Sequence, residues 1–245
     1  GEFFDVLCFE RMNQMRLLVA IGILVAVLAG AWVLFNRSAA PIMLPVAKGD
    51  SVASWYFTGA YSNNSELEAK AQAEIADMRS LIGNSEEFTD YQLYIQIATQ
   101  YELLGDGAQA YAFLNKAAAI DPVHTGLAWA NLGELMERLG AFNTGRIAYA
   151  KAVEAQSSVM GYHTARLAFL IQHFSNDTEA VEGAFGEAQA KFGDAPQILQ
   201  LKAQWLTSLK KFSEAIMVWR QMRAQVAAEM QPSIDREIEW LQRKL

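Results

Sequence analysis

The chain has 245 residues and a net charge of −7; 52% of its residues are hydrophobic and 19% are charged. That apolar content can supply a packed core, which excludes a wholly disordered chain. Because the sequence has no basic cluster, it also argues against a nucleic-acid partner, which needs a positive surface. Its single cysteine, Cys8, excludes a disulfide framework within one chain.

Residues 1–14 are interpreted as an N-terminal tail that begins without a methionine. Three origins stay open for its first part: a cloning scar, upstream read-through, or the end of something longer. We place the natural start at Met12 or Met15 and leave the preceding stretch out of the fold prediction.

Residues 15–36 are predicted to form a transmembrane helix. The run Leu17–Phe35 has no charged residue, and Arg16 and Arg37 bracket it. A helix of this length spans about 28 Å, close to the hydrocarbon thickness of a bilayer. The alternatives are a cleaved signal peptide, whose apolar region is usually shorter at about 7–15 residues, and a buried core helix. We therefore expect a single-pass anchor in the cell membrane.

The orientation of this anchor depends on the start of the protein. Basic residues are almost balanced on the two sides of the apolar run, so the charge rule barely distinguishes the two orientations. With a start at Met12 or Met15 the short N-terminus stays inside. That orientation places the helical domain on the extracytoplasmic (periplasmic) side.

Residues 37–64 read as a linker containing Pro, Gly and Ser, with an aromatic cluster of Trp55, Tyr56, Phe57 and Tyr61. The cluster could dock on the helical domain, lie at the membrane surface, or bind a partner. Docking is favoured because exposing aromatic side chains to water is unfavourable. If the aromatic residues lay in the partner groove, they would inhibit binding.

The C-terminal three quarters of the chain are predicted to be helical. Ser65-x-x-Glu68 has the form of a capping box that opens a helix to about Ile82. Ser85 or Thr89 then begins the next helix.

Residues 90–122 show the pattern of a helical hairpin. Two apolar stripes with spacings of three and four residues predict two helices, separated by a Gly-Asp-Gly turn at 105–107. Asp121 and Pro122 are expected to supply the N-cap and the first residue of the following helix. The stripe residues are Tyr94, Ile97, Ala98 and Tyr101, then Ala110, Leu114 and Ala117.

This hairpin resembles a unit of the tetratricopeptide repeat (TPR) family, in which small residues let two helices approach and larger ones fill the gaps. The next unit begins near Gly126. Trp129, Leu132 and Gly133 match the W-x2-L-G opening of the repeat.

Two further units follow. The third, about 162–195, is degenerate because its first helix lacks the small-residue signature, although Asp177 can cap its second helix. The fourth runs from Pro196 to about 229, and the residues from Pro232 onward have the pattern of an end-cap helix. Equivalent positions recur every 34–36 residues, against about 34 in the family; they are Ala117, Ala152, Ala188 and Met222.

The resemblance covers about residues 91–229 and implies an all-α fold. We expect residues 65–245 to form a right-handed solenoid of TPR-like helical hairpins with end-cap helices, preceded by one transmembrane helix. Bacterial envelope proteins that this plan resembles assist cytochrome c maturation, translocon-linked chaperoning, and pilus or secretion assembly.

The family binds protein or peptide partners in a concave groove lined by the first helix of each unit, and its groove positions identify candidate partner-binding residues here. In some members Lys and Asn side chains clamp a C-terminal carboxylate. Only Asn131 fits that pattern, so an acidic tail is not the expected partner. The candidates are Gln92, Ile95, Gln96, Thr99, Leu127, Asn131, Glu134, Arg138, His163 and Arg166, with His173, Gln197, Gln200 and Gln204 as further positions.

The sequence contains no phosphate-binding glycine loop, no H-E-x-x-H and no Cys or His pair at metal spacing. We therefore predict no catalytic residue, no metal and no cofactor. The expected function is a non-enzymatic, membrane-anchored adaptor or scaffold that binds a protein or peptide during assembly of an envelope complex. The alternative is a self-associating structural subunit of a membrane complex or filament apparatus, a homo-oligomer sealed by Trp240 and Leu241.

Overall fold

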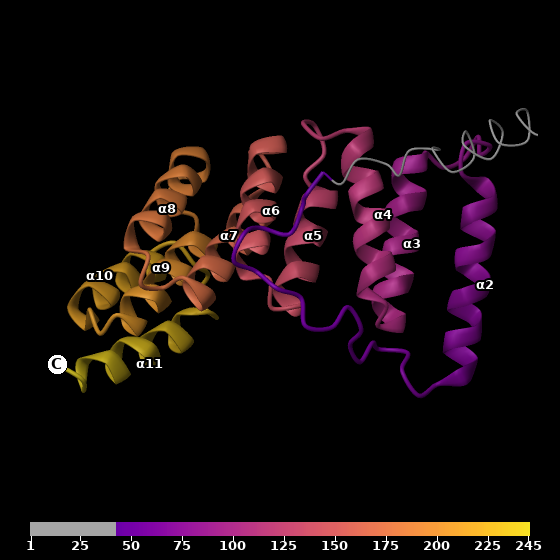
Figure 1. Cartoon of the computed structure of the whole chain (residues 1–245). Helices are drawn as coiled ribbons and strands as arrows, with labels where there is room; N and C mark the ends of the chain where they lie inside the picture. Colours follow the sequence, from indigo (N-terminus) through magenta and orange to yellow (C-terminus); the bar gives the residue numbers. More distant parts are fainter. Residues whose placement is uncertain (1–42) are drawn as a thin grey trace, which may run out of the picture. The chain divides into compact units, whose positions relative to one another are not determined.

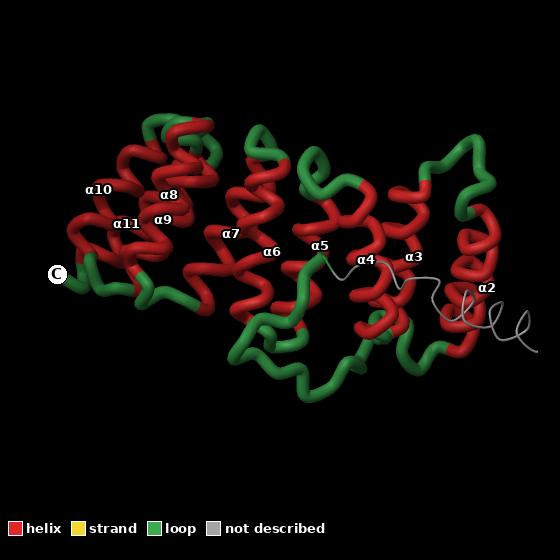
Figure 2. Tube along the Cα trace, turned by 45° about the horizontal axis from the view of Figure 1, so that its top comes forward, coloured by secondary structure: helices red, strands yellow, loops and turns green. Residues whose placement is uncertain are grey.

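The computed structural model describes residues 43–245, which form a row of helices joined by loops (Figure 1). These residues contain ten α-helices and no β-strand (Figure 2). The helices are α2 (Ser65–Leu81), α3 (Asp90–Leu104), α4 (Gly107–Ile120), α5 (Leu127–Arg138), α6 (Phe142–Ala155), α7 (Met160–His173), α8 (Thr178–Phe192), α9 (Pro196–Ser208), α10 (Phe212–Arg223) and α11 (Gln231–Gln242). The predicted all-α class is confirmed, and the repeat-like row is compatible with a solenoid.

The predicted transmembrane helix, residues 15–36, lies outside the described residues. Between residues 43 and 245, no helix is both long and apolar enough to cross a membrane. The anchor and the side of the membrane therefore stay predictions.

Short turns join the helices into hairpins. The N-cap of α3 is Thr89, whose side chain forms a capping box with Gln92, and its C-cap is Gly105, with a left-handed φ of 82°. Asp106 follows at once and caps α4 by accepting a hydrogen bond from the backbone N–H of Gln109 at 3.0 Å. Such a tight connection makes α3 and α4 adjacent antiparallel helices.

The predicted capping box of α2 is wrong by one residue. The N-cap is Asn64, whose side chain accepts a hydrogen bond from the backbone N–H of Leu67. The Glu68 carboxylate accepts one from the backbone N–H of Asn63 at 3.1 Å. Ser65 is therefore the first residue of the helix, and an Asn side chain performs the role expected of it.

The predicted start of α5 at Asp121 and Pro122 is also wrong. Asp121 is the C-cap of α4, and α5 begins after Gly126. The carbonyl of Pro122 accepts a hydrogen bond from Nε1 of Trp129 at 3.0 Å, so the loop packs back on the helix that follows it.

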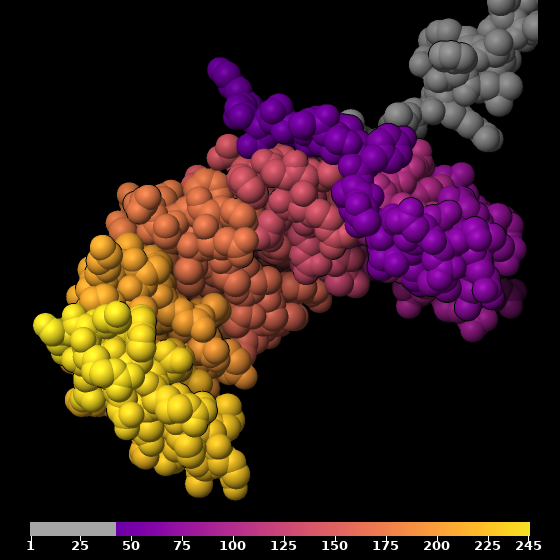
Figure 3. Space-filling view, turned by 90° about the horizontal axis from the view of Figure 1, so that it is seen from below, coloured from indigo at the N-terminus to yellow at the C-terminus, as the bar shows by residue number. Residues whose placement is uncertain are grey.

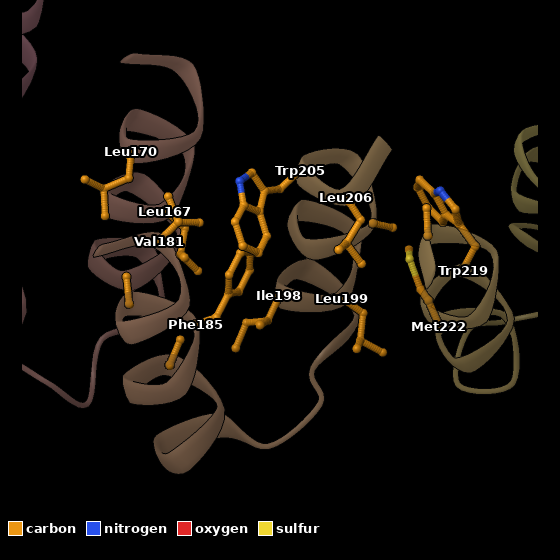
Figure 4. Close-up of a cluster of buried hydrophobic side chains, with 14 of the residues drawn as sticks. Leu167, Leu170, Val181, Phe185, Ile198, Leu199, Trp205, Leu206, Trp219 and Met222 are labelled. Carbon is orange, nitrogen blue, oxygen red and sulfur yellow. The ribbon is translucent and has the colours of Figure 1, made fainter. Parts of the chain in front are cut away.

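The core forms two clusters along the row, one over α2–α6 and the other mainly over α7–α11. In the second cluster the rings of Phe185 and Trp205 lie 5.7 Å apart, with Ile198 beside them (Figure 4). In the first hairpins small residues allow close approach: a Cβ added at Gly133 would lie 3.0 Å from the ring of Tyr149. This packing is what the repeat resemblance implied for Gly133.

Residues 43–64, here called the strap, form the indigo segment that runs along one side of the row before α2 (Figure 1 and Figure 3). Leu44 is 1% exposed. Its N–H donates to Oδ1 of Asn115 at 2.9 Å, and its carbonyl accepts from the hydroxyl of Tyr111. Three residues later, the N–H of Ala47 donates to Oγ1 of Thr144 at 2.9 Å. Backbone groups of the strap are thus hydrogen-bonded to side chains of α4 and α6.

Asp50 of the strap acts as the cap of α6, which has no side-chain cap of its own. One carboxylate oxygen accepts from the N–H and the Oγ1 of Thr144, both at 2.7 Å. The other accepts from the side-chain amide of Asn143 at 2.8 Å and from its N–H at 3.3 Å. Burial acts to raise the pKa of Asp50, but these hydrogen bonds together lower it below its ordinary value.

The end of the strap docks on the turn between α3 and α4. Phe57 N–H donates to the carbonyl of Gly105 at 3.1 Å, and Gly107 N–H donates to the carbonyl of Trp55 at 2.8 Å. A Cβ on Gly59 would lie 2.2 Å from the carbonyl oxygen of Leu103, so only glycine permits this approach. The favoured interpretation, docking of the aromatic linker on the helical domain, is confirmed for Trp55 and Phe57, whereas Tyr56 is 70% exposed.

Candidate functional site

The row has two faces that matter for binding. The first-helix face is formed by α3, α5, α7 and α9, and the second-helix face by α4, α6, α8 and α10. The strap holds residues of α4 and α6 on the second-helix face. The predicted groove belongs to the first-helix face.

Two hollows adjoin on the first-helix face. One, of about 360 Å³, lies between α2 and α3 and is lined by Glu74, Asp77, Met78, Gln96, Thr99 and Gln100. The other, of about 370 Å³, lies between α3 and α5 and is lined by Ala60, Thr99, Glu102, Leu103, Asn131, Glu134 and Arg138. Because Thr99 lines both, the two hollows form one surface, which we call the α2–α5 groove.

Five of the ten candidates meet in this groove: Gln96, Thr99, Asn131, Glu134 and Arg138. They come from α3 and α5, in which Gln96 and Asn131, like Thr99 and Glu134, are 35 residues apart, close to the repeat spacing of about 34. Ala60 of the strap lines the groove, and the guanidinium of Arg138 lies 4.9 Å over the ring of Phe57 at the same end. Trp55 instead stacks at 5.0 Å on Tyr111 of α4, away from the groove.

The groove is acidic. Its lining contains the carboxylates of Glu74, Asp77, Glu102 and Glu134, but one basic side chain, Arg138, and no lysine. Nη1 of Arg138 lies 3.6 Å from Oε2 of Glu102. This charge balance would repel a carboxylate terminus and attract a cationic segment.

The surroundings of Glu102 change the pKa of its carboxyl group. Burial raises its pKa, Arg138 acts in the opposite direction, and the nearby Glu134 raises it further. The side chain is 18% exposed. An additional positive charge in the groove would stabilise the ionised form of this carboxylate.

Gln100 adds an unsatisfied acceptor to the same surface. Its Nε2 donates to Oε2 of Glu74 at 2.8 Å, while its Oε1 is buried and has no donor among the described residues. Exchanging the amide atoms would place two oxygens against each other, so the orientation is determined by Glu74.

The remaining candidates on α3 and α5 do not line the hollows. Gln92 is occupied in the capping box with Thr89. Ile95 packs against the core, and Leu127, 42% exposed, stands at the start of α5. Gln200 and Gln204 line a separate cavity of about 430 Å³ between α9, α10 and α11.

His163 and Arg166 are not where the sequence analysis placed them. They face α6 and α8 and line a hollow between those helices. His163 is 4% exposed, and Arg166 forms an ion pair with Glu187, N to O 2.6 Å. The expected position in the first-helix groove is not observed, because the degenerate third unit left the register of α7 undetermined.

His173 is likewise engaged within the fold. Its Nε2 lies 2.8 Å from Oε1 of Glu137, and its ring stacks on Phe142 at 4.1 Å. These contacts join the end of α7 to α5 and α6. They occupy most of the imidazole surface that a partner could contact.

Sequence reasoning found Glu134 but missed the other three acidic residues of the groove, which are Glu74, Asp77 and Glu102. Glu102 follows Thr99 by three positions and so lies on the same side of α3; helical periodicity could have found it. Glu74 and Asp77 belong to α2, which lies outside the repeat pattern, and nothing in their spacing indicated contact with α3.

No family model matches the chain, and no curated protein is significantly similar to it. The likeness to TPR repeats therefore remains a resemblance carried by residues such as Trp129, Leu132 and Gly133.

Proposed function

We propose that this protein is a membrane-anchored, non-enzymatic adaptor that binds a segment of another protein in its α2–α5 groove during assembly of an envelope complex. The predicted anchor at 15–36 would hold the helical domain at the membrane, on the periplasmic side. The repeat-like row would present the groove to the partner.

One observation carries this proposal: five candidate residues of α3 and α5 line the α2–α5 groove, and the strap borders this groove only at the end formed by Leu103 and Arg138. Most of the hydrogen bonds of the strap go to α4, α6 and the α3–α4 turn. The charge of the groove favours a partner segment bearing Lys or Arg.

Photocrosslinking in native membranes tests the proposal. A photoreactive amino acid at Asn131 is compared with one at Glu179, an exposed position on α8 of the second-helix face. We expect a discrete partner from Asn131 that is lost when Glu134 is changed to Lys and retained when it is changed to Gln. Equal capture from both positions, or from neither, would contradict an adaptor that uses this groove.

Self-association is the second candidate, and α11 supplies its specific observation. Trp240 is 41% exposed at the end of the row, whereas Leu241 is fully buried. Leu241 therefore belongs to the core, and Trp240 alone could contact a second copy. If Trp240→Ala dissociates an oligomer and leaves the Asn131 crosslink unchanged, the structural subunit is favoured.

A further inference from the structure

Large apolar side chains are exposed on two neighbouring loops, α4–α5 and α6–α7. Ile120, the last residue of α4, is 49% exposed, Val123 of the following loop is 61% exposed, and Leu127, the first residue of α5, is 42% exposed. Val159, directly before α7, is 36% exposed. We call these four residues the apolar edge. Single exposed apolar residues are ordinary on a protein surface, whereas a group of them marks an interaction site.

The two loops are held together. The N–H of Gly126 donates to Oε1 of Gln156 at 2.9 Å, which joins the α4–α5 loop to the end of α6. A Cβ added at Gly126 would lie 2.4 Å from the ring of Tyr162, so the loop packs tightly on α7. Residues 122–127 and 155–160 contain no Asp, Glu, Lys or Arg. The apolar edge is therefore a fixed surface of low charge.

The opposite ends of the same helices have a different surface. Among the described residues, Phe142 is the exposed large apolar side chain at the opposite ends of α5, α6, α7 and α8, and its ring stacks at 4.1 Å on His173. The α7–α8 loop ends with Asp177, which pairs with Arg146 at 3.0 Å. Exposed apolar residues therefore gather at one edge of this part of the row.

The strap enters the helical domain near the apolar edge. Leu44 bonds to Asn115, and Ile120 follows Asn115 by five residues, about 7.5 Å along the axis of α4. At Asp50 the strap has reached Thr144 at the start of α6, which lies at the opposite edge. In Figure 1 the indigo strap begins just below the level of the α4–α5 loop and then passes downward.

The chain length before the strap limits its distance from a membrane. The predicted anchor ends at residue 36, and the steps from Asn36 to Met43 span at most about 25 Å when fully extended. Because Leu44 is bonded to α4, the end of α4 stays close to the bilayer that holds the anchor. The later bonds of the strap, to α6 and to the α3–α4 turn, fix the helical domain to this tether.

We propose that the apolar edge lies against the lipid bilayer that holds the predicted anchor. This inference rests on the anchor of the proposed function and adds the orientation of the helical domain. The four side chains enter the interfacial layer of the bilayer, where burial of apolar surface supplies the contact. The contact is apolar and needs no anionic lipid. α5 then runs away from the membrane, and the α2–α5 groove faces sideways, accessible to a partner.

Fluorescence quenching in nanodiscs tests this orientation. The full chain, with its single cysteine removed by Cys8→Ser, carries a fluorophore on one introduced cysteine, Ser158→Cys or Asn176→Cys. Both positions are exposed and lie at the two ends of α7, which is about 21 Å long. The nanodiscs contain phosphatidylcholine with or without a nitroxide on its acyl chain. We expect the nitroxide to quench the label at position 158 several-fold more strongly than the label at position 176.

Two charged substitutions of matched exposure separate lipid contact from tethering alone. Val123→Asp should lower the quenching at position 158 at least about twofold, because burial of a carboxylate at the apolar edge is unfavourable. Met217→Asp changes a residue of α10 that is 62% exposed, against 61% for Val123, and should leave the quenching unchanged. Circular dichroism establishes that each variant is folded.

Equal quenching of the two labels would overturn the inference. A label at position 158 that is shielded from water but not quenched would also overturn it, because a protein would then cover the edge. Extraction of native membranes with alkaline carbonate tests the anchor separately. If the chain resists extraction and the labels are quenched equally, only this inference fails and the adaptor proposal stands; if carbonate releases the chain, both fail.

Discussion

The second and third hairpins, α5–α6 and α7–α8, follow the same plan but are completed in different ways. α6 has no side-chain cap of its own and receives Asp50 from the strap, whereas α8 is capped by the adjacent Asp177. Leu44 of the strap is buried, and its N–H donates to Asn115 of α4. A repeat unit that lacks a local cap can thus be completed by a distant segment of the chain.

The largest expected effect concerns the buried anchor of the strap. Leu44→Ala should cost about 2–5 kcal/mol of strap docking, the range for a buried leucine. Hydrogen exchange at the amides of Leu44 and Ala47 should accelerate accordingly. Val46→Ala is the matched control, because Val46 is 36% exposed, and it should cost less than about 1 kcal/mol. Equal effects of the two changes would show that the strap is not anchored at Leu44.

The second-largest effect is expected at the N-cap of α6. Asp50→Ala should destabilise α6 by about 0.5–2 kcal/mol, as for the loss of an ordinary N-cap. Thermal unfolding followed by circular dichroism measures the change. Asp177→Ala at α8 is the local counterpart, and its effect should be of similar size although no strap is involved. A negligible effect at Asp50 alone would mean that the strap does not stabilise α6.

Acid should weaken the docking of the strap. The folded-state pKa of Asp50 is lowered, so its contribution is present above the unfolded pKa of about 3.9 and is lost as the pH falls through the lower folded value. We expect exchange of the Ala47 amide to rise below about pH 4. In Asp50→Asn this rise should be absent. A pH dependence that persists in the variant would assign it to another group.

The smallest effect is expected at Glu102 on the first-helix face. Its raised pKa means that its favourable contribution is present below the unfolded pKa and is lost as the pH rises through the folded one. Glu102→Gln should therefore raise the thermal stability at pH 7, by at most about 1 kcal/mol. The gain should vanish below about pH 4. A loss of stability at pH 7 would instead show that the contact with Arg138 outweighs desolvation.

Most of the helices could be predicted because their signals are local. The stripe of Ile97, Ala98 and Tyr101 recurs with the helical period and is buried as expected. The first residue of a helix was harder to predict where two neighbouring polar residues could each serve as the N-cap, as Asn64 and Ser65 could. Five of the ten candidate residues found from repeat spacing share a groove, among them Thr99, Asn131 and Glu134.

The sequence by itself determined an all-α, repeat-like chain, because helix formation and the apolar stripe depend on residues three and four apart. Only the tertiary structure decided where the strap docks and which way His163 faces. The bonds of Leu44 to Asn115 and of Ala47 to Thr144 join residues 71 and 97 positions apart. No local spacing encodes such pairs. They form because buried backbone groups need partners once the helices are packed.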